Sequence, residues 1–137
     1  MIERDSAIVE LEWNDSGDVI TSGMLGDAVA QLLEYFEGRR QTFDLPLQPR
    51  GSDFQQKFYA ALCAIPFGET RTYGDLAADL GVSAQAIGQA CGANPIAILI
   101  PCHRVLGATG LGGFSGAGGV EAKVELLKLE GAASLLI

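Results

Sequence analysis

The chain has 137 residues, of which 48% are hydrophobic and 19% are charged, and its formal net charge is −8. This length favours one domain, or a small lobe packed on a larger one, and the composition excludes a disordered chain. No apolar run approaches the roughly 18 residues needed to span a bilayer, and the first residues show no signal-peptide pattern, so we expect a cytoplasmic protein without membrane association.

The first part of the chain predicts a strand followed by a helix. Residues 8–13 alternate between apolar and polar side chains, as a half-buried strand does, and Val19 with Ile20 can pair with it across the intervening turn. Residues 24–37 then carry apolar side chains at helical spacing, and Gly38 follows as a stop. The apolar positions of this helix are Leu25, Val29, Leu32, Leu33 and Phe36.

An extended connection separates this part from the rest. Residues 41–51 contain two prolines, which favour extended backbone over helix. A helix that Ser52 or Asp53 can cap follows the connection. We therefore expect two units, a strand-helix lobe over residues 1–48 and a larger domain over residues 49–137.

Two short helices joined by a tight turn are predicted at residues 73–80 and 84–91. Thr72 and Ser83 can cap them, and Gly81 makes the turn. These are the dimensions of a helix-turn-helix, although short helical hairpins are mostly scaffolding. The second helix carries small or neutral side chains, which suit close approach to a DNA groove and equally suit packing on another helix. They are Ser83, Ala84, Gln85, Ala86, Gly88, Gln89 and Ala90.

The negative charge lies mainly in the first part of the chain. Residues 1–50 contain ten acidic residues and four arginines, a balance of −6. Residues 51–110 contain four acidic and three basic residues, a balance of −1. The acidic first part can therefore face away from DNA, which reduces its repulsion of the phosphates. The remaining binding face is nearly neutral, and this predicts weak and localised DNA contacts.

The segment Pro101-Cys102-His103-Arg104 contains the only histidine of the chain, directly after a cysteine. It follows the apolar residues 96–100, which predict a buried strand or extended segment. Neighbouring side chains on a strand point to opposite faces, so Cys102 and His103 can interact only if the backbone turns helical there or if a water bridges them. The alternative is a buried, inert cysteine beside a histidine satisfied by hydrogen bonds.

The number and spacing of the cysteines indicate free thiols. The chain has three cysteines without paired spacing, which fits a reducing compartment and leaves Cys102 available as a nucleophile. One histidine and the absence of a Cys-x-x-Cys motif leave little from which to assemble a zinc site. We expect neither a metal nor a cofactor.

The sequence around Cys102 resembles the active-site signature of the O6-alkylguanine-DNA alkyltransferases. The Pro-Cys-His-Arg core is highly specific for that family, and the resemblance covers roughly residues 45–131. It implies an α/β fold, with a small N-terminal strand-helix lobe and a mainly helical C-terminal domain that contains the helix-turn-helix. The segments that match, in the family's order, are Phe54-Gln55-Gln56, Ile65 to Thr70, Thr72-Tyr73-Gly74, Ala86 to Ala90, Asn94 to Val105, Gly112 to Gly116 and Lys123 to Glu130.

The resemblance implies a DNA repair protein that flips an alkylated guanine out of duplex DNA and transfers the alkyl group to Cys102. The thioether is stable, so each molecule acts once, as a methylated-DNA–protein-cysteine methyltransferase that we expect to be monomeric. His103 would take the thiol proton through water, and Glu130 would hold His103 and favour its charged form. A base is needed because a free thiol, with a pKa of about 8.5, is mostly protonated at neutral pH.

The resemblance also assigns binding residues. Tyr73 and Ser115 would donate to N3 and O6 of the guanine, while the backbone carbonyls of Cys102 and Val105 would accept from its exocyclic amine. Asn94 would fix the turn before the active site. Phe114 stands in the binding loop where tyrosine is frequent. The DNA contacts would come from Thr72, Ser83, Ala84, Gln85, Gly88 and Arg104.

The chain departs from the family pattern in places. Gln85 replaces an arginine that most members insert into the base stack, and the loop at residues 116–119 is longer than in many members. Metal ligands found near the N-terminus of some members are missing. Two other functions remain open, a lesion sensor without repair activity and a cysteine hydrolase based on Cys102 and His103.

Overall fold

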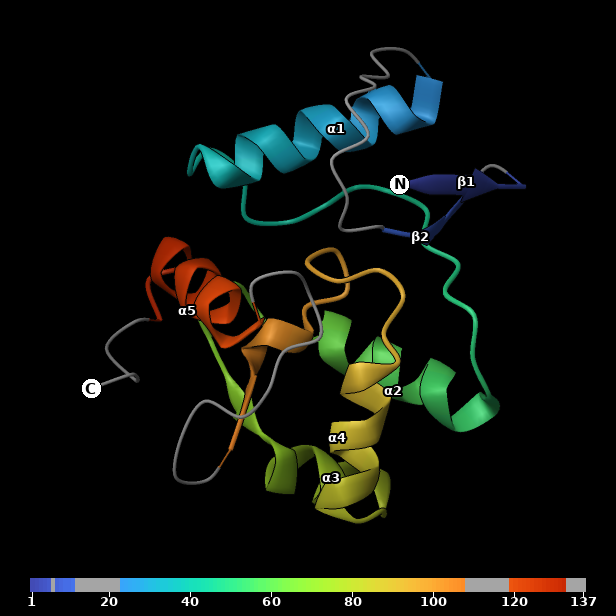
Figure 1. Cartoon of the computed structure of the whole chain (residues 1–137), viewed down its shortest axis with the longest axis vertical. Helices are drawn as coiled ribbons and strands as arrows, with labels where there is room; N and C mark the ends of the chain where they lie inside the picture. Colours follow the sequence, from blue (N-terminus) through green and yellow to red (C-terminus); the bar gives the residue numbers. More distant parts are fainter. Residues whose placement is uncertain (6, 12–22, 108–118, 133–137) are drawn as a thin grey trace.

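A computed structural model describes residues 1–5, 7–11, 23–107 and 119–132. Its small N-terminal lobe of two strands and one helix lies beside a mainly helical C-terminal domain, which confirms the predicted α/β class (Figure 1). Several sequence predictions concern residues outside these ranges, namely Val19, Ile20, Phe114, Ser115 and residues 116–118. Among the helices that are described, none is long and apolar enough to cross a membrane.

The strand predicted at residues 8–13 is present as β2, Ala7–Glu10, and it pairs with β1, Ile2–Arg4, in an antiparallel hairpin. Its other edge bonds to the connection between the lobes, where Ile8 N donates to Pro46 O at 2.8 Å and Gln48 N donates to Ile8 O at 2.7 Å. Both edges of β2 are therefore occupied. Val19 and Ile20, the predicted pairing partners of this strand, lie outside the described residues, so that pairing stays a prediction.

Helix α1, Gly23–Phe36, matches the prediction in its limits but not in its buried face. Ala28 and Tyr35, seven residues or two turns apart, are buried, whereas Leu33 and Phe36 are 54% and 49% exposed. The helix is turned so that Tyr35 faces the C-terminal domain. Apolar spacing alone did not reveal this, because the anchoring residue is an amphipathic tyrosine.

The C-terminal domain begins with α2, Asp53–Cys63, whose predicted cap is a complete capping box between Ser52 and Gln55. The predicted helix-turn-helix is formed by α3, Tyr73–Leu80, and α4, Ala84–Gly92. Strand β3, Arg71–Thr72, pairs in parallel with β4, Val105–Leu106. This pairing ties the start of the helix pair to the segment that follows Cys102.

Residues 96–100 form a compact buried turn rather than the predicted strand or extended segment. Ile100 N donates to Ile96 O at 2.9 Å, and Ile98 has a φ of +74°. The side chain of Asn94 satisfies buried backbone groups of the turn, because it donates to Ile100 O at 2.9 Å and accepts from Ile96 N at 3.0 Å. Apolarity thus predicted the burial of this segment, but not its backbone path.

The turn between α3 and α4 depends on Gly81, which has a φ of +68°. We expect Gly81→Ala to lower the free energy of unfolding by about 1 kcal/mol, because a Cβ disfavours left-handed backbone. Gly88→Ala is the matched control, since Gly88 lies inside α4 and a Cβ added there would meet no atom within 4 Å. It should instead raise stability by about 0.5–1 kcal/mol. Urea unfolding measures both, and an equal response would contradict the assignment.

Candidate active site

The Cys-His pair lies on a 3-10 turn, η1, Cys102–Arg104. Arg104 N donates to Pro101 O at 3.1 Å, which closes the turn. A 3-10 helix has three residues per turn, so consecutive side chains are about 120° apart instead of on opposite faces. The backbone thus turns helical at the place where the sequence required it for Cys102 and His103 to cooperate. All three side chains of η1 are buried.

Glu130 is the carboxylate on which this turn is fixed. It follows directly after α5, Gly119–Leu129, and is buried. His103 Nε2 lies 2.7 Å from Glu130 Oε2, and Arg104 donates from Nε to Oε1 at 2.8 Å and from Nη2 to Oε2 at 3.0 Å. Tyr35 of α1 donates its hydroxyl to Oε2 at 2.6 Å. Three side chains from two elements therefore hold one buried carboxylate.

The protonation states of this cluster follow from burial and hydrogen bonding. Burial alone would raise the pKa of Glu130, but hydrogen bonds from His103 and Arg104 outweigh it and lower the pKa to about 2. Burial lowers the pKa of His103; Glu130 acts in the opposite direction, as expected from the sequence, but does not outweigh it. The resting imidazole is therefore neutral. With an ionised acceptor beside Nε2, the ring proton lies on Nε2 and Nδ1 keeps a free lone pair.

Two features of the site suit proton transfer from Cys102. Burial raises the pKa of the Cys102 thiol, although a hydrogen bond with Asn94 and the charge of Lys123 act to lower it, so the resting thiol is protonated. Nδ1 of His103 is buried and has no hydrogen-bond partner among the described residues. A neutral base beside a protonated thiol is the arrangement that general-base activation of a cysteine requires.

Lys123 is a feature of the site for which the sequence predicted no role. It is fully buried in α5, donates from Nζ to Val105 O at 2.6 Å, and lies 5.8 Å from the ring centre of Tyr73. Its signal in the sequence was a lysine on an otherwise apolar helix face, and buried lysines are rare unless paired. The positive charge of Lys123 therefore acts on the ring of Tyr73, on the carbonyl of Val105 and on the thiol of Cys102.

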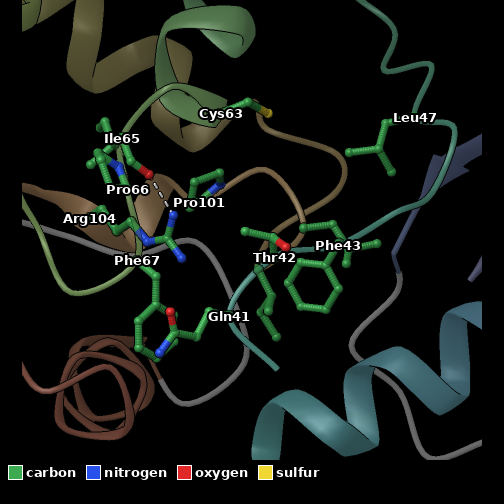
Figure 2. Close-up of a pocket in the computed structure, with 12 residues that line it drawn as sticks. Gln41, Thr42, Phe43, Leu47, Cys63, Ile65, Pro66, Phe67, Pro101 and Arg104 are labelled. Atoms are coloured by element: carbon green, nitrogen blue, oxygen red, sulfur yellow. Dashed lines mark hydrogen bonds between the residues drawn. The ribbon is translucent and has the colours of Figure 1, made fainter. Parts of the chain in front are cut away.

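The structure does not support a DNA contact for Arg104. Its guanidinium is engaged by Glu130 and by the carbonyl of Ile65, at 2.7 Å from Nη1, and it lies 5.9 Å from the ring centre of Phe67 (Figure 2). A cavity of about 200 Å³ borders this side of Arg104, between the lobe connection and the end of α2. Cys102 is not among the residues that line it, so this cavity is distinct from the thiol site.

The remaining residues assigned to DNA lie together on the helix-turn-helix. In α4 the side chains that face solvent include Ala84 and Gln85, whereas Ile87 and Ala90 pack inward. Thr72 is half-buried, and its hydroxyl accepts from Asp75 N as the cap of α3. The exposed α4 positions assigned to DNA, with the cap residue before them, are Ser83, Ala84, Gln85 and Gly88.

The site combines a buried cysteine, histidine and carboxylate with a helix-turn-helix in the same domain. This combination defines a class of protein that has a thiol with a neighbouring base and a helix pair suited to DNA. Comparison with known proteins gives the family. The chain belongs to the 6-O-methylguanine DNA methyltransferases: the family model of their DNA binding domain matches residues 53–132, and that of their ribonuclease-like domain matches residues 2–49. The resemblance noted in the sequence is confirmed.

Individual relatives agree with this family. Methylated-DNA–protein-cysteine methyltransferase of Mycobacterium tuberculosis is 50% identical over 111 residues, 79% of this chain and 66% of that protein. The protein of the same name from Methanosarcina barkeri is 50% identical over 107 residues, 76% of this chain and 66% of that protein. The crystal structure of Mycobacterium tuberculosis OGT in complex with DNA is 49% identical, with a TM-score of 0.74 over 80% of this chain and 67% of that chain. The present chain thus spans 66% of the length of these curated relatives.

The cluster predicts a loss of stability in acid in two stages. Because the pKa of His103 is below 6.5 in the folded state, the unfolded chain binds an extra proton as the pH falls below that value. A second loss begins near pH 4.5, because the pKa of Glu130 is about 2 in the folded state. Urea unfolding followed by circular dichroism from neutral pH to about pH 3.5 measures both stages.

Asp75→Asn is the control for this prediction. The pKa of Asp75 is also lowered, by hydrogen bonds with Thr72, but Asp75 lies on the surface of the helix pair. The two-stage loss should persist in this variant. If stability became independent of pH in Asp75→Asn, the assignment to His103 and Glu130 would be wrong.

Proposed function

We propose that this protein repairs O6-alkylguanine in double-stranded DNA by transferring the alkyl group to Sγ of Cys102, once per molecule. The observation that carries the proposal is that Cys102 and His103 lie on the same buried 3-10 turn, with the ring of His103 held by Glu130. The family and the names of the relatives support the same reaction.

In the proposed step, Nδ1 of His103 accepts the Cys102 proton through a water. The thiolate attacks the alkyl carbon, an S–C bond forms, and the bond from that carbon to O6 breaks with its electron pair leaving on the guanine. Glu130 stabilises the imidazolium that results, because it stays ionised. No further reaction of the thioether follows, so the thiol is consumed.

The leaving guanine needs hydrogen-bond donors for its developing negative charge. We assign this role to Tyr73, at the first position of α3, and to Ser115, the neighbour of Phe114 in the sequence. The carbonyls of Cys102 and Val105 would accept from the exocyclic amine. Val105 O already accepts from Lys123, so the amine would use its second lone pair.

We propose that α4 docks in the minor groove through its exposed small residues, with Gln85 filling the space left by the flipped base. Support comes from the helix-turn-helix geometry and from a relative whose crystal structure is described as a complex with DNA. The protein would act as a monomer in the cytoplasm, where a reducing environment keeps Cys102 a free thiol.

The transfer is tested by incubation with O6-benzylguanine followed by intact mass and peptide mapping. We expect one benzyl group per molecule, located on Cys102, because only this thiol is next to the His103 base. Cys102→Ser should form no adduct, whereas Cys63→Ser, which changes an exposed thiol, should react like the wild type. Binding of alkylated duplex DNA without any adduct would instead indicate a lesion sensor.

The docking is tested by Gln85→Arg. We expect tighter binding to alkylated duplex DNA, and a slope of log affinity against log salt that is steeper by about one, because one more positive charge within the DNA-binding surface releases about one more counterion. Gln48→Arg is the matched control, since it adds the same charge at an exposed position outside α4. Unchanged affinity for Gln85→Arg, or an equal gain for Gln48→Arg, would refute the docking of α4.

A further inference from the structure

Tyr35 connects the N-terminal lobe to the active-site cluster. Its side chain is 1% exposed and comes from α1, 95 residues before Glu130 in the sequence. The ring packs against Phe43 of the lobe connection and Phe67 of the C-terminal domain, with ring centres 5.4 Å and 6.3 Å apart. Its hydroxyl therefore approaches Glu130 from a fixed direction rather than as a loose surface contact.

We propose that Tyr35 is a positioning residue for the alkyl transfer: by donating to Glu130 from the N-terminal lobe, it fixes the carboxylate and limits how strongly His103 holds a proton. This inference rests on the proposed function for its consequence in the reaction. The hydrogen-bond geometry on which it stands is independent of that function.

One carboxylate oxygen is shared by three side chains. Oε2 of Glu130 accepts from Tyr35 at 2.6 Å, lies 2.7 Å from His103 Nε2, and accepts from Arg104 at 3.0 Å. Donors that share an oxygen share its negative charge, so each one weakens the attraction that the others experience. Loss of the Tyr35 hydroxyl would leave more of that charge to His103 and favour the imidazolium.

The other charged or titratable groups that act on His103 do not replace Tyr35. Arg104, on the same turn, and Lys123, on α5, both lower the pKa of His103 through their positive charge. Arg104 binds both oxygens of Glu130 and would remain in place without Tyr35. Tyr35 is itself a constant donor, because burial raises the pKa of its hydroxyl and keeps it neutral. Within the described residues, it is the only hydrogen-bond donor to Glu130 that the N-terminal lobe supplies.

The test uses the single histidine of the chain as a direct probe. In full-length protein labelled with ¹⁵N-histidine, the ring shifts of His103 report its titration and its tautomer without assignment ambiguity. We expect Tyr35→Phe to move the titration midpoint to higher pH. Its reaction with free O6-benzylguanine, which does not depend on DNA binding, should slow at pH values below the shifted midpoint, because less neutral base is present there; a midpoint raised by one pH unit corresponds to a loss of about tenfold.

Tyr59→Phe is the matched control. Tyr59 is also buried, but its hydroxyl lies 3.5 Å from the carbonyl of Ala93 and does not contact Glu130. The control should leave the His103 titration unchanged. Incorporation of 3-fluorotyrosine at position 35 gives a second variant that keeps the hydroxyl and makes it a stronger donor, so here the midpoint should move to lower pH.

The outcomes separate the two proposals. If wild-type protein forms no adduct, the proposed function fails, while the titration still tests the link between Tyr35 and His103. If adduct forms but both position-35 variants titrate and react like the wild type, Tyr35 has no positioning role. A midpoint that moves equally in Tyr59→Phe would likewise overturn the inference, because the effect would then come from general loosening of the core.

Discussion

The structure depends on one buried carboxylate. Burying Glu130 without partners would cost several kcal/mol, and the protein avoids this by surrounding it with donors from Tyr35, His103 and Arg104. These donors come from the N-terminal helix and the 3-10 turn, while Glu130 itself follows the last described helix. The interaction that orders the catalytic turn therefore also holds the lobes together.

The same cluster sets the resting protonation states of the Cys102 thiol and of the His103 base. Burial keeps Cys102 protonated and His103 neutral, and the positive charges of Arg104 and Lys123 also act to lower the pKa of His103. A protonated thiol and a neutral imidazole are the protonation states from which the proposed alkyl transfer starts. For the proposed single transfer, this arrangement has the advantage that the nucleophile does not ionise before its substrate is bound.

The local elements were predictable where local chemistry dominates. Helix α2 and the helix pair begin directly after Ser52, Thr72 and Ser83, because the side-chain oxygens of these cap residues satisfy the first amides of each helix. The prediction for residues 96–100 failed because a short apolar run specifies burial without specifying strand or turn, and Asn94, not a neighbouring strand, satisfies its backbone.

The sequence by itself determined the positions of helices α1 to α4, the Cys-His pair and, through a specific motif, the family. Only the tertiary structure decided that Arg104 holds a carboxylate, that Lys123 is buried, and that Tyr35 reaches the cluster around Glu130. The physical reason is that capping and helical spacing act over a few residues. The partner of a buried charge is chosen by how distant segments pack, and no local pattern encodes it.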